Sequence, residues 1–455
     1  MFTSARVRVR RSRWVGRLIL LTACCGPAAP SNAAEPARQD GSAATETDLA
    51  EWADDRYPEL LNLYRHLHSN PELSLQETET AAFIATRWRN AGYVVTEGVG
   101  GTGVVGILKN GDGPNVMLRC DLDALPVKEA TDLPFASTVT AQRSDGSETG
   151  VMHACGHDLH MTAVTGAGMY FAERQEEWSG TLMLIAQPAE EIGAGAKAML
   201  DDGLFARFPK PDYAVALHVT PKAVAGTIET LAGYSLANVD SVDVVFKGRG
   251  GHGAQPHTTI DPIVMAAEFV LSAQAIVARE INPSAPAVVT VGSIQAGSKH
   301  NIISDEAKLQ LTVRSYSDEV RETLLSAIER RAKGVAAAAG AEPPTVEASE
   351  GTPSLYNDPT LTARLTNVFQ NELGEENVGT AKASMGGEDF SRYGRAGVPI
   401  LMYSLGTVAP RDQMRYDKAG LTPPGLYSAE YAPDVETALP IGLRTLISAG
   451  LELLD

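Results

Sequence analysis

Short runs of apolar residues along the chain pass directly into polar residues. The runs occupy positions 116–120, 181–186 and 213–217, and the residues that follow them are Asp121, Gln187 and His218. Runs of this length predict buried strands, and helical spacing at 160–175 predicts a helix between the first two. Strands that alternate with helices predict an α/β sheet, in which ligands bind beyond the carboxyl ends of the strands. We therefore expect these polar side chains to converge.

The same patterns predict further elements on both sides of this core. Apolar residues at helical or strand-like spacing mark helices at 49–70, 78–91, 361–372 and from about 435, and strands at 94–97, 104–109 and 398–405. Together with the three buried runs, these elements predict one large domain built from 49–237 and 350–455.

The pattern changes near Asn238. It predicts strands at 240–247, 287–295 and 308–315, and long amphipathic helices at 261–280 and 318–339. The order strand, helix, strand, strand, helix indicates a small open α+β sandwich that is inserted as a separate domain at 238–349. The proline-containing segment 340–353 is expected to be the return linker.

The first 34 residues have the three-part layout of an export signal. An arginine-rich start precedes the apolar run Leu18 to Cys25, and small residues follow up to a cleavage site at Ala33. The apolar run is too short for a membrane span. Residues 21–24 also resemble a lipoprotein cleavage box, so Cys24 could instead become a lipidated N-terminus. We expect a periplasmic or secreted protein with a flexible lead-in at 35–48.

Composition limits the partners. The chain has 38 Lys and Arg against 56 Asp and Glu, a net charge of −18, with 44% hydrophobic residues. Such a chain is typical of soluble globular proteins, and its charge repels nucleic acid and anionic membranes. Without the signal, the cysteines are Cys120 and Cys155. In an oxidising compartment they could form a disulfide, which would remove Cys155 as a metal ligand.

Candidate metal ligands cluster at 152–160. Cys155 and His157 are separated by one glycine, and thiolate and imidazole both suit zinc-like ions. Alone, the pair is also compatible with a buried cysteine beside a structural histidine. His218, at the predicted end of its strand, could supply a third donor. Asp121 and Asp123 either orient histidines or cap a turn.

Glu190 and Glu191 follow a buried strand and a proline. Adjacent side chains on an extended segment point in opposite directions. One of the two carboxylates could therefore bind a metal ion while the other accepts a proton from a metal-bound water as general base. A solvated acidic pair in a loop is the alternative.

The predicted inserted domain carries a second group of polar residues. His252 is flanked by glycines and could donate a hydrogen bond to the oxyanion of amide hydrolysis, although the segment could also be only a glycine-rich turn. Asn301 and Arg314 lie on neighbouring strand segments, where Arg314 could bind a carboxylate. An alternative chemistry is a cysteine hydrolase that uses Cys155 with His157 or His153.

Several segments, taken together, carry a family resemblance. In chain order they are Arg65 to Ser74, Asp121 to Pro126, His153 to His160, Gln187 to Glu191, His252 to His257, Asn301 to Ile303 and Met385 to Phe390. The chain resembles the aminoacylase and hippurate hydrolase group of dinuclear metallopeptidases, in the branch with the plant auxin-amide hydrolases. The segments span nearly the whole chain after the signal.

The resemblance implies a phosphorylase/hydrolase-like mixed-sheet catalytic domain with an inserted ferredoxin-like domain that acts as a lid and dimerises. It implies two divalent ions, of manganese, zinc, nickel or cobalt, and an N-acyl or N-aminoacyl amino acid as substrate. Residue by residue, it implies metal ligands at Cys155, His157, Glu191 and His218, the general base Glu190, a carbonyl-polarising His252 from a partner subunit, and a carboxylate grip by Asn301 and Arg314.

The chain departs from the family pattern at one position. Relatives have a ligand histidine in a Leu-His-Ser segment, and this chain has Tyr427 in the segment 425–431. A neutral phenol is a weaker ligand than imidazole. A metal-bound phenolate would be one outcome; otherwise one metal position would be weak, or the enzyme would work with one ion. The substitution could also accompany a shifted substrate choice, or the chain would be a binding protein on the same fold that has lost turnover.

Overall fold

The computed structural model describes residues 46–143 and 145–455. The predicted export signal at 1–34, the possible lipidation site Cys24 and most of the lead-in at 35–48 lie outside the described residues. Helix α1 spans Glu46–Ser69 and so begins slightly before the predicted start at Leu49.

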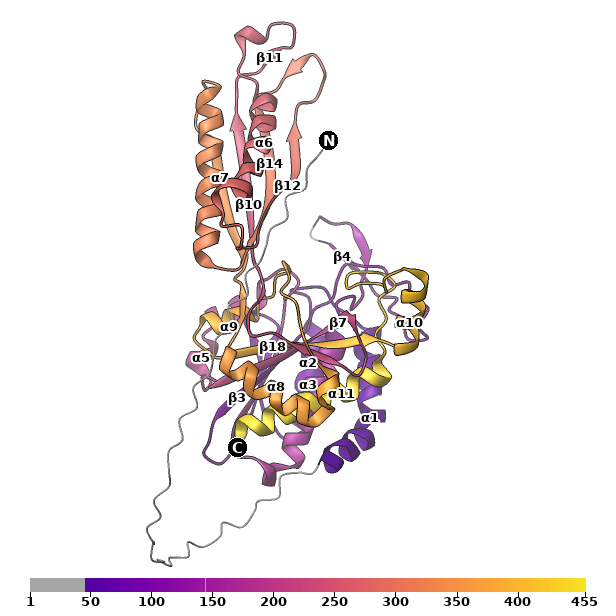
Figure 1. Cartoon of the computed structure of the whole chain (residues 1–455). Helices are drawn as coiled ribbons and strands as arrows, with labels where there is room; N and C mark the ends of the chain where they lie inside the picture. The colour runs from indigo at the N-terminus through magenta and orange to yellow at the C-terminus, as the bar shows by residue number, and fades with distance from the viewer. Residues whose placement is uncertain (1–45, 144) are drawn as a thin grey trace, which may run out of the picture. The chain divides into compact units, whose positions relative to one another are not determined.

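A mixed sheet forms the centre of the fold (Figure 1). Within the described residues it has eight strands in the order β1-β2-β6-β3-β7-β18-β8-β17. Their bounds are Val94–Val99 (β1), Gly103–Asn110 (β2), Gly180–Gln187 (β6), Asn115–Asp121 (β3), Tyr213–Val224 (β7), Ile400–Val408 (β18), Ile228–Thr230 (β8) and Val378–Thr380 (β17). The central strands β6, β3, β7 and β18 run parallel to one another. This confirms the predicted α/β class with a mixed sheet.

Side chains of the central strands alternate between two apolar layers. On β3, Leu118 belongs to one buried cluster and Met117 to another; on β6, Leu184 and Met183 divide in the same way. Because both faces of these strands are buried, they appear in the sequence as continuous apolar runs.

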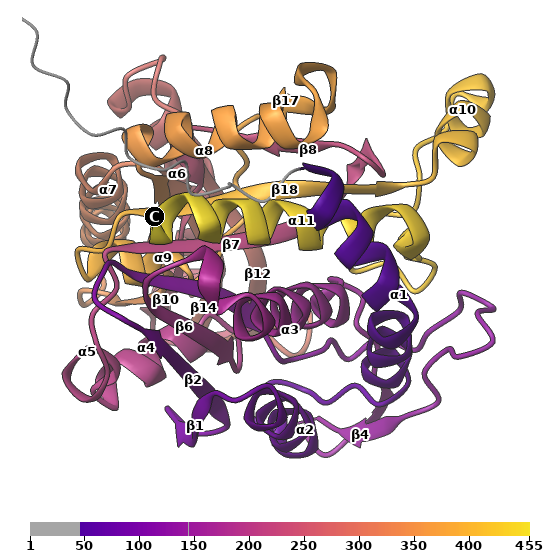
Figure 2. The ribbon, with the colours of Figure 1, turned by 90° about the horizontal axis from the view of Figure 1, so that it is seen from below.

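Helices cover both faces of the central sheet. Helices of the first cluster are α1, α2 (Thr78–Asn90), α3 (His157–Glu173), α8 (Pro359–Leu373) and α11 (Val435–Leu454). Helices of the second are α4 (Gly195–Asp201), α5 (Leu204–Arg207) and α9 (Ser391–Arg395). Figure 2 shows α8, α11 and α3 next to one another, in agreement with their contacts. The buried helix α3 connects β3 to β6 and carries polar residues at its start.

A second, four-stranded antiparallel sheet lies within 238–352. Its order is β12-β14-β10-β15, and it packs against two helices through its own buried cluster. The bounds are Asn238–Lys247 (β10), Pro262–Glu280 (α6), Ala287–Ala296 (β12), Glu306–Ser315 (β14), Asp318–Ala338 (α7) and Thr345–Thr352 (β15). The chain order and strand order are those of the expected ferredoxin-like sandwich. Its status as a separate domain with bounds 238–349 stays a prediction.

Two predictions about local structure were wrong. The segment 340–353 is not merely a linker, because β15 within it pairs with β10. Most β15 side chains are exposed, so the segment lacks the apolar alternation of a half-buried strand. Strand β7 also continues past His218 to Val224, which places His218 inside the strand rather than at its end.

Shorter elements complete the described chain. They are β4 (Thr140–Gln142), β5 (Glu148–Gly150), η1 (Gln175–Glu177), β9 (Gly233–Leu236), β11 (Gly251–His252), η2 (Pro256–Thr258), β13 (Ile302–Ile303), β16 (Leu355–Asn357), η3 (Glu375–Asn377) and α10 (Pro410–Ala419). By length and composition alone, α6 and α11 could each cross a membrane, but α11 is mostly buried within the protein.

Candidate metal centre

Strand register brings the chemistry-bearing segments together. In the parallel pair β3 and β6, Asp121 lies opposite Gln187, so the segments that follow both strands leave the sheet side by side. Strand β7 lies on the other side of β3, with Ala216 opposite Arg119, two residues before His218. This is the convergence at the carboxyl ends of strands that the sequence predicts.

A glycine allows the turn before α3 to approach β7 closely. Gly156 has a φ of 77°, and a Cβ atom built on it would lie 2.5 Å from the Val219 side chain. Any larger residue would push the turn away from β7 and would be strained in this conformation. Gly156 therefore sets the approach of Cys155 and His157 to His218.

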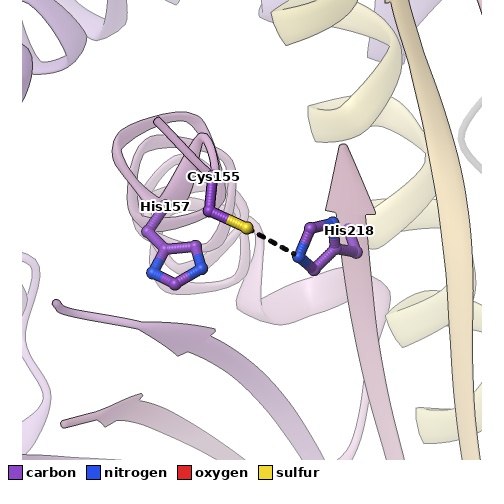
Figure 3. Close-up of side chains that lie close together, drawn as sticks. All are labelled: Cys155, His157 and His218. Atoms are coloured by element: carbon purple, nitrogen blue, oxygen red, sulfur yellow. Dashed lines mark hydrogen bonds between the residues drawn. The ribbon is translucent and has the colours of Figure 1, made fainter. Parts of the chain in front are cut away.

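Three ligand atoms of the predicted set meet at this point. The Cys155 sulfur lies 3.6 Å from Nε2 of His218, and Figure 3 shows Cys155 and His157 at the start of one helix, with His218 on the facing strand. Ligand atoms of these three residues all lie within 4.8 Å of one another. Cys120 and Cys155 are both free thiols, so the alternative of a disulfide between them is not realised.

The two glutamates also lie next to His157. Its Nε2 atom is 3.8 Å from Glu191 Oε1 and 3.9 Å from Glu190 Oε2. The preceding Ala189 has a φ of 50°, a conformation that costs a non-glycine residue about 1–3 kcal/mol. The buried carboxylate of Glu77 accepts the Ala189 N–H at 2.8 Å, which holds this turn in place.

Hydrogen bonds fix the ring orientation of the histidines. His157 Nδ1 donates to the Asp123 carbonyl at 2.7 Å, which leaves its Nε2 open. His218 Nδ1 donates to the Val219 carbonyl at 2.8 Å, which leaves its Nε2 open as well. Such partners select the tautomer that presents one nitrogen to a metal ion. Asp123 therefore orients a histidine, although it does so through its backbone oxygen.

His160 belongs to the support of the site. Its Nε2 accepts the Val219 N–H at 3.0 Å, and its Nδ1 donates to Asp121 at 2.7 Å. Burial lowers the pKa of His160 to about 4, so the ring is neutral, as this bonding pattern requires. Asp121 in turn accepts Arg119 Nη1 at 2.8 Å. A continuous chain of hydrogen bonds thus runs from His218 to Arg119.

The buried donor atoms fit a metal ion. His157 Nε2, Glu191 Oε1 and Asp123 Oδ1 are buried without a hydrogen-bond partner in the described structure. Buried polar atoms normally have partners, and an unsatisfied group requires an explanation such as an ion. Thiolate, imidazole and carboxylate are also the donor types that zinc-like ions take. The residues present therefore fit a divalent cation.

Burial shapes the acid–base behaviour of the site. Burial raises the pKa of the Cys155 thiol well above its usual range, although His157 opposes the shift. Burial, with repulsion from Glu388, likewise raises the pKa of Glu190. In the metal-free protein the Cys155 thiol is neutral and so a poor nucleophile, which counts against the cysteine-hydrolase alternative.

The second predicted group lies elsewhere. His252, on β11, is exposed. It follows the Lys247 end of β10, whereas Asn238 lies at the other end of that strand. At about 3.3 Å per residue, β10 spans roughly 30 Å. Asn301 lies beside Gly253, at the His252 end, whereas Arg314 pairs with Val239 at the other end. One chain therefore does not place Asn301 next to Arg314, and its described contacts do not join His252 to the metal ligands.

Tyr427 does lie at the candidate metal centre. Its hydroxyl donates to Glu191 Oε2 at 2.5 Å, and its backbone N–H donates to the Ala154 carbonyl at 2.9 Å. Burial, with the nearby Cys155 and Glu191, raises the pKa of Tyr427, so its hydroxyl keeps its proton.

A buried histidine network that we did not predict supports the start of α3. His68 Nδ1 donates to Asp158 at 2.7 Å, and its Nε2 donates to Glu129 at 2.9 Å. Burial alone would lower the pKa of His68, but the two carboxylates outweigh it and raise the pKa to about 10. His68 and Asp158 both lie in motif segments of the sequence, and that was the only signal for their role.

Comparisons with known proteins agree with this geometry. The family described as Peptidase family M20/M25/M40 matches residues 117–417. An N-acetylcysteine deacetylase of Bacillus subtilis (strain 168) is 36% identical over 380 residues, which are 82% of this chain and 96% of the relative. A hippurate hydrolase of Campylobacter jejuni is 40% identical over 289 residues, which are 62% of this chain and 72% of the relative.

A solved structure shares the fold. A Bacillus subtilis protein described as a dinuclear metal binding peptidase from the M20 family is 31% identical, with a TM-score of 0.72. The alignment covers 88% of this chain and 99% of that protein.

The His68 network predicts a pH dependence of stability. The pKa of His68 is raised from 6.5 to about 10 in the folded state, so the stabilisation is complete below pH 6.5 and is lost as the pH rises toward 10. Replacing His68 by Gln should therefore destabilise the protein strongly at neutral pH and much less near pH 10, as measured by urea unfolding. The matched control is the exposed His66 on the same helix, whose pKa is lowered. Replacing His66 by Gln should change the free energy of unfolding by an amount that stays constant between neutral pH and pH 10. If that change varied with pH equally in both variants, the network would be refuted.

Proposed function

Because the chain belongs to peptidase family M20/M25/M40, and its relatives are named as hydrolases, we propose that it hydrolyses the amide bond of N-acyl or N-aminoacyl amino acids. Such substrates include N-acetyl amino acids, hippurate-like compounds and dipeptides. One observation carries the proposal: atoms of Cys155, His157, His218 and Glu191 that can bind a metal ion converge beside Glu190.

Cys155, His157, Glu191 and His218 would hold divalent metal of the manganese, zinc, nickel or cobalt type. When bound, such an ion lowers the pKa of a coordinated water toward neutrality and polarises a carbonyl oxygen. The relative described as dinuclear supports two ions as the family expectation.

Glu190 would act as the general base. Its carboxylate lies next to the ligand group but has no hydrogen-bond donor from a described side chain that would neutralise it, and its pKa is raised by burial. A carboxylate with a raised pKa is a stronger base, which can accept the proton of the attacking water and then release it to the leaving amine. Arg314 and Asn301 are proposed to bind the substrate carboxylate, and because one chain holds the two residues apart, they would come from the two subunits of a dimer.

The hydrogen bond of Tyr427 to Glu191 favours a second candidate function. If the tyrosine impairs the centre, the protein would bind its ligand without turnover. Thermal stabilisation by N-acetyl amino acids with no product formed would support that candidate over hydrolysis.

The main proposal predicts metal-dependent hydrolysis that requires Glu190. Chelation should abolish cleavage of N-acetyl amino acids, hippurate and dipeptides, and manganese or zinc should restore it. The Glu190→Gln variant should lose about 100-fold or more in kcat at unchanged metal content, because the side chain keeps its shape but no longer accepts a proton. Glu51→Gln, on the exposed surface of α1, is the control. Cleavage that survives chelation, or full activity of Glu190→Gln, would refute the proposal.

A homodimer is the second part of the proposal. Helix α6 exposes Ile263, Val264 and Leu271, the last with 75% of its surface accessible, although the helix is strongly apolar. The neighbouring β12 is an open edge of its sheet and exposes Ile294. Apolar side chains beside an open strand edge are typical of an interface. A second copy of the chain would cover them and could bring the partner's His252 to the metal ligands.

Mixing inactive variants tests this arrangement. Light scattering should show a dimer, and Leu271→Glu should give monomers. His252→Ala and Glu190→Gln should each be inactive alone. A mixed dimer of the two would keep one intact site, so an equal mixture after subunit exchange should regain about a quarter of wild-type activity. No recovery in verified mixed dimers would show that His252 does not act across the interface.

Export is proposed from the sequence of residues 1–34 alone. N-terminal analysis of the mature protein should find Glu35 as the first residue, because the small residues up to Ala33 and Ala34 form the cleavage site. A lipidated Cys24 would instead establish the lipoprotein alternative, and an intact Met1 would exclude both.

A further inference from the structure

Tyr427 brings an aromatic hydroxyl group into the candidate metal centre. Its backbone is tied to the Ala154 carbonyl at 2.9 Å, beside the turn that carries Cys155. Its φ of 67° is a conformation that residues other than glycine keep only where surrounding contacts impose it. The backbone at Tyr427 is therefore held by the fold, and the side chain, although 57% exposed, is directed to Glu191 by its hydroxyl hydrogen bond.

The histidines at the centre have few open nitrogen atoms. His157 and His218 each use Nδ1 for a backbone carbonyl, so each can offer an ion only Nε2. His160 can offer none, because Asp121 and the Val219 N–H occupy both of its nitrogens. Among the histidines grouped at the centre, these bonds limit the imidazole donors to His157 and His218; His153, whose ring nitrogens are buried without a partner in the described structure, is not grouped with the ligand atoms.

The ligand groups at the centre share an atom. Ligand atoms of Cys155 and His218 lie close to one of His157, and ligand atoms of Glu190 and Glu191 also lie close to one of His157. Since His157 offers only Nε2, it can bind one ion, and the other members of both groups lie around that ion. The sulfur, the two imidazole nitrogens and Glu191 Oε1 make four donors, the number that zinc-like ions take in tetrahedral sites.

A second ion would have to share the Cys155 sulfur or take the other carboxylate oxygen of Glu191. If it shared the sulfur, it would have no further imidazole of its own, because His157 and His218 serve the first ion. The other Glu191 oxygen, Oε2, already accepts the Tyr427 hydroxyl at 2.5 Å. A hydroxyl that donates its proton is neutral, and neutral phenol is not among the usual ligands of these ions, which are thiolate, imidazole and carboxylate.

Building on the proposed function, we infer that this chain holds one tightly bound divalent ion and that Tyr427 is a hydrogen-bond donor to Glu191 rather than a metal ligand. The hydroxyl keeps Glu191 a one-oxygen ligand. The inference replaces the family expectation of two ions for this chain and gives Tyr427 a positioning role.

Metal content of the wild-type protein is the first test. The full chain is purified, loaded with Mn²⁺ or Zn²⁺, dialysed and analysed by mass spectrometry for ions per chain. We expect one ion per chain, and the electron paramagnetic resonance spectrum of the Mn²⁺ form should be that of isolated ions. Two tightly held ions with a spin-coupled spectrum would overturn the inference, and this result does not depend on any variant folding.

Variants at position 427 test the role of the hydroxyl. Tyr427→Phe keeps the ring and removes the donor, so it should retain its single ion. Loss of that ion from a folded Tyr427→Phe protein would show that the tyrosine is a ligand and would overturn the inference. Tyr427→His replaces the phenol by imidazole and should raise the metal content toward two ions per chain. Tyr356→His, at an exposed tyrosine, is the matched control and should stay at one.

The outcomes separate this inference from the proposed function. One ion per chain with no hydrolysis of any amide tested would uphold the inference and refute the function. Two ions per chain with metal-dependent hydrolysis would refute the inference and uphold the proposed function.

Discussion

The parallel pairing of β3 with β6 and β7 is the constraint on which the candidate metal centre depends. It places the segment after Asp121 beside the segment after Gln187, and it brings β7 close enough for His218 to face Cys155. Side chains alternate along a strand, so a slip of one residue would turn every side chain to the opposite face. The polar contacts of β3 oppose such a slip, because it would turn the buried Arg119 away from Glu388 and Asp389 toward the opposite apolar layer. The packing of the core thus sets the positions of the ligands.

A buried cation connects this framework to the C-terminal part of the chain. Arg119 is almost completely buried and donates to Asp121, Glu388 and Asp389, and also to Gln187. Burying a charge is costly unless it is paired and hydrogen-bonded, and here several acceptors share it. The arrangement joins β3, the end of β6 and the segment before α9 into one polar network. Glu190 lies at the edge of that network, which explains why its environment is both buried and negatively charged.

The sequence predicted the central elements well, because buried strands and helices carry strong apolar patterns. It also predicted which polar residues would converge, since Asp121, Glu190 and Glu191 follow apolar strands directly. It failed where no apolar pattern exists: β15 is a mostly exposed edge strand, and β7 continues through Pro221. The pattern did not reveal that β13 and the full length of β14 separate Asn301 from Arg314 within one chain, and their shared role in substrate binding stays a prediction. The roles of Glu77, His68 and Arg119 depend on contacts distant in sequence, which no local pattern reveals.

The loop that carries Tyr427 is held by its backbone, through the Ala154 carbonyl, and not by its side chain. Position 427 can therefore change its residue without moving the loop, whereas Gly156, pressed against Val219, cannot. Tyrosine and histidine codons differ by a single base. Natural variation at this position could thus alter the metal chemistry of the protein in one evolutionary step while leaving the fold intact, so relatives with nearly the same structure need not share the same requirement for ions.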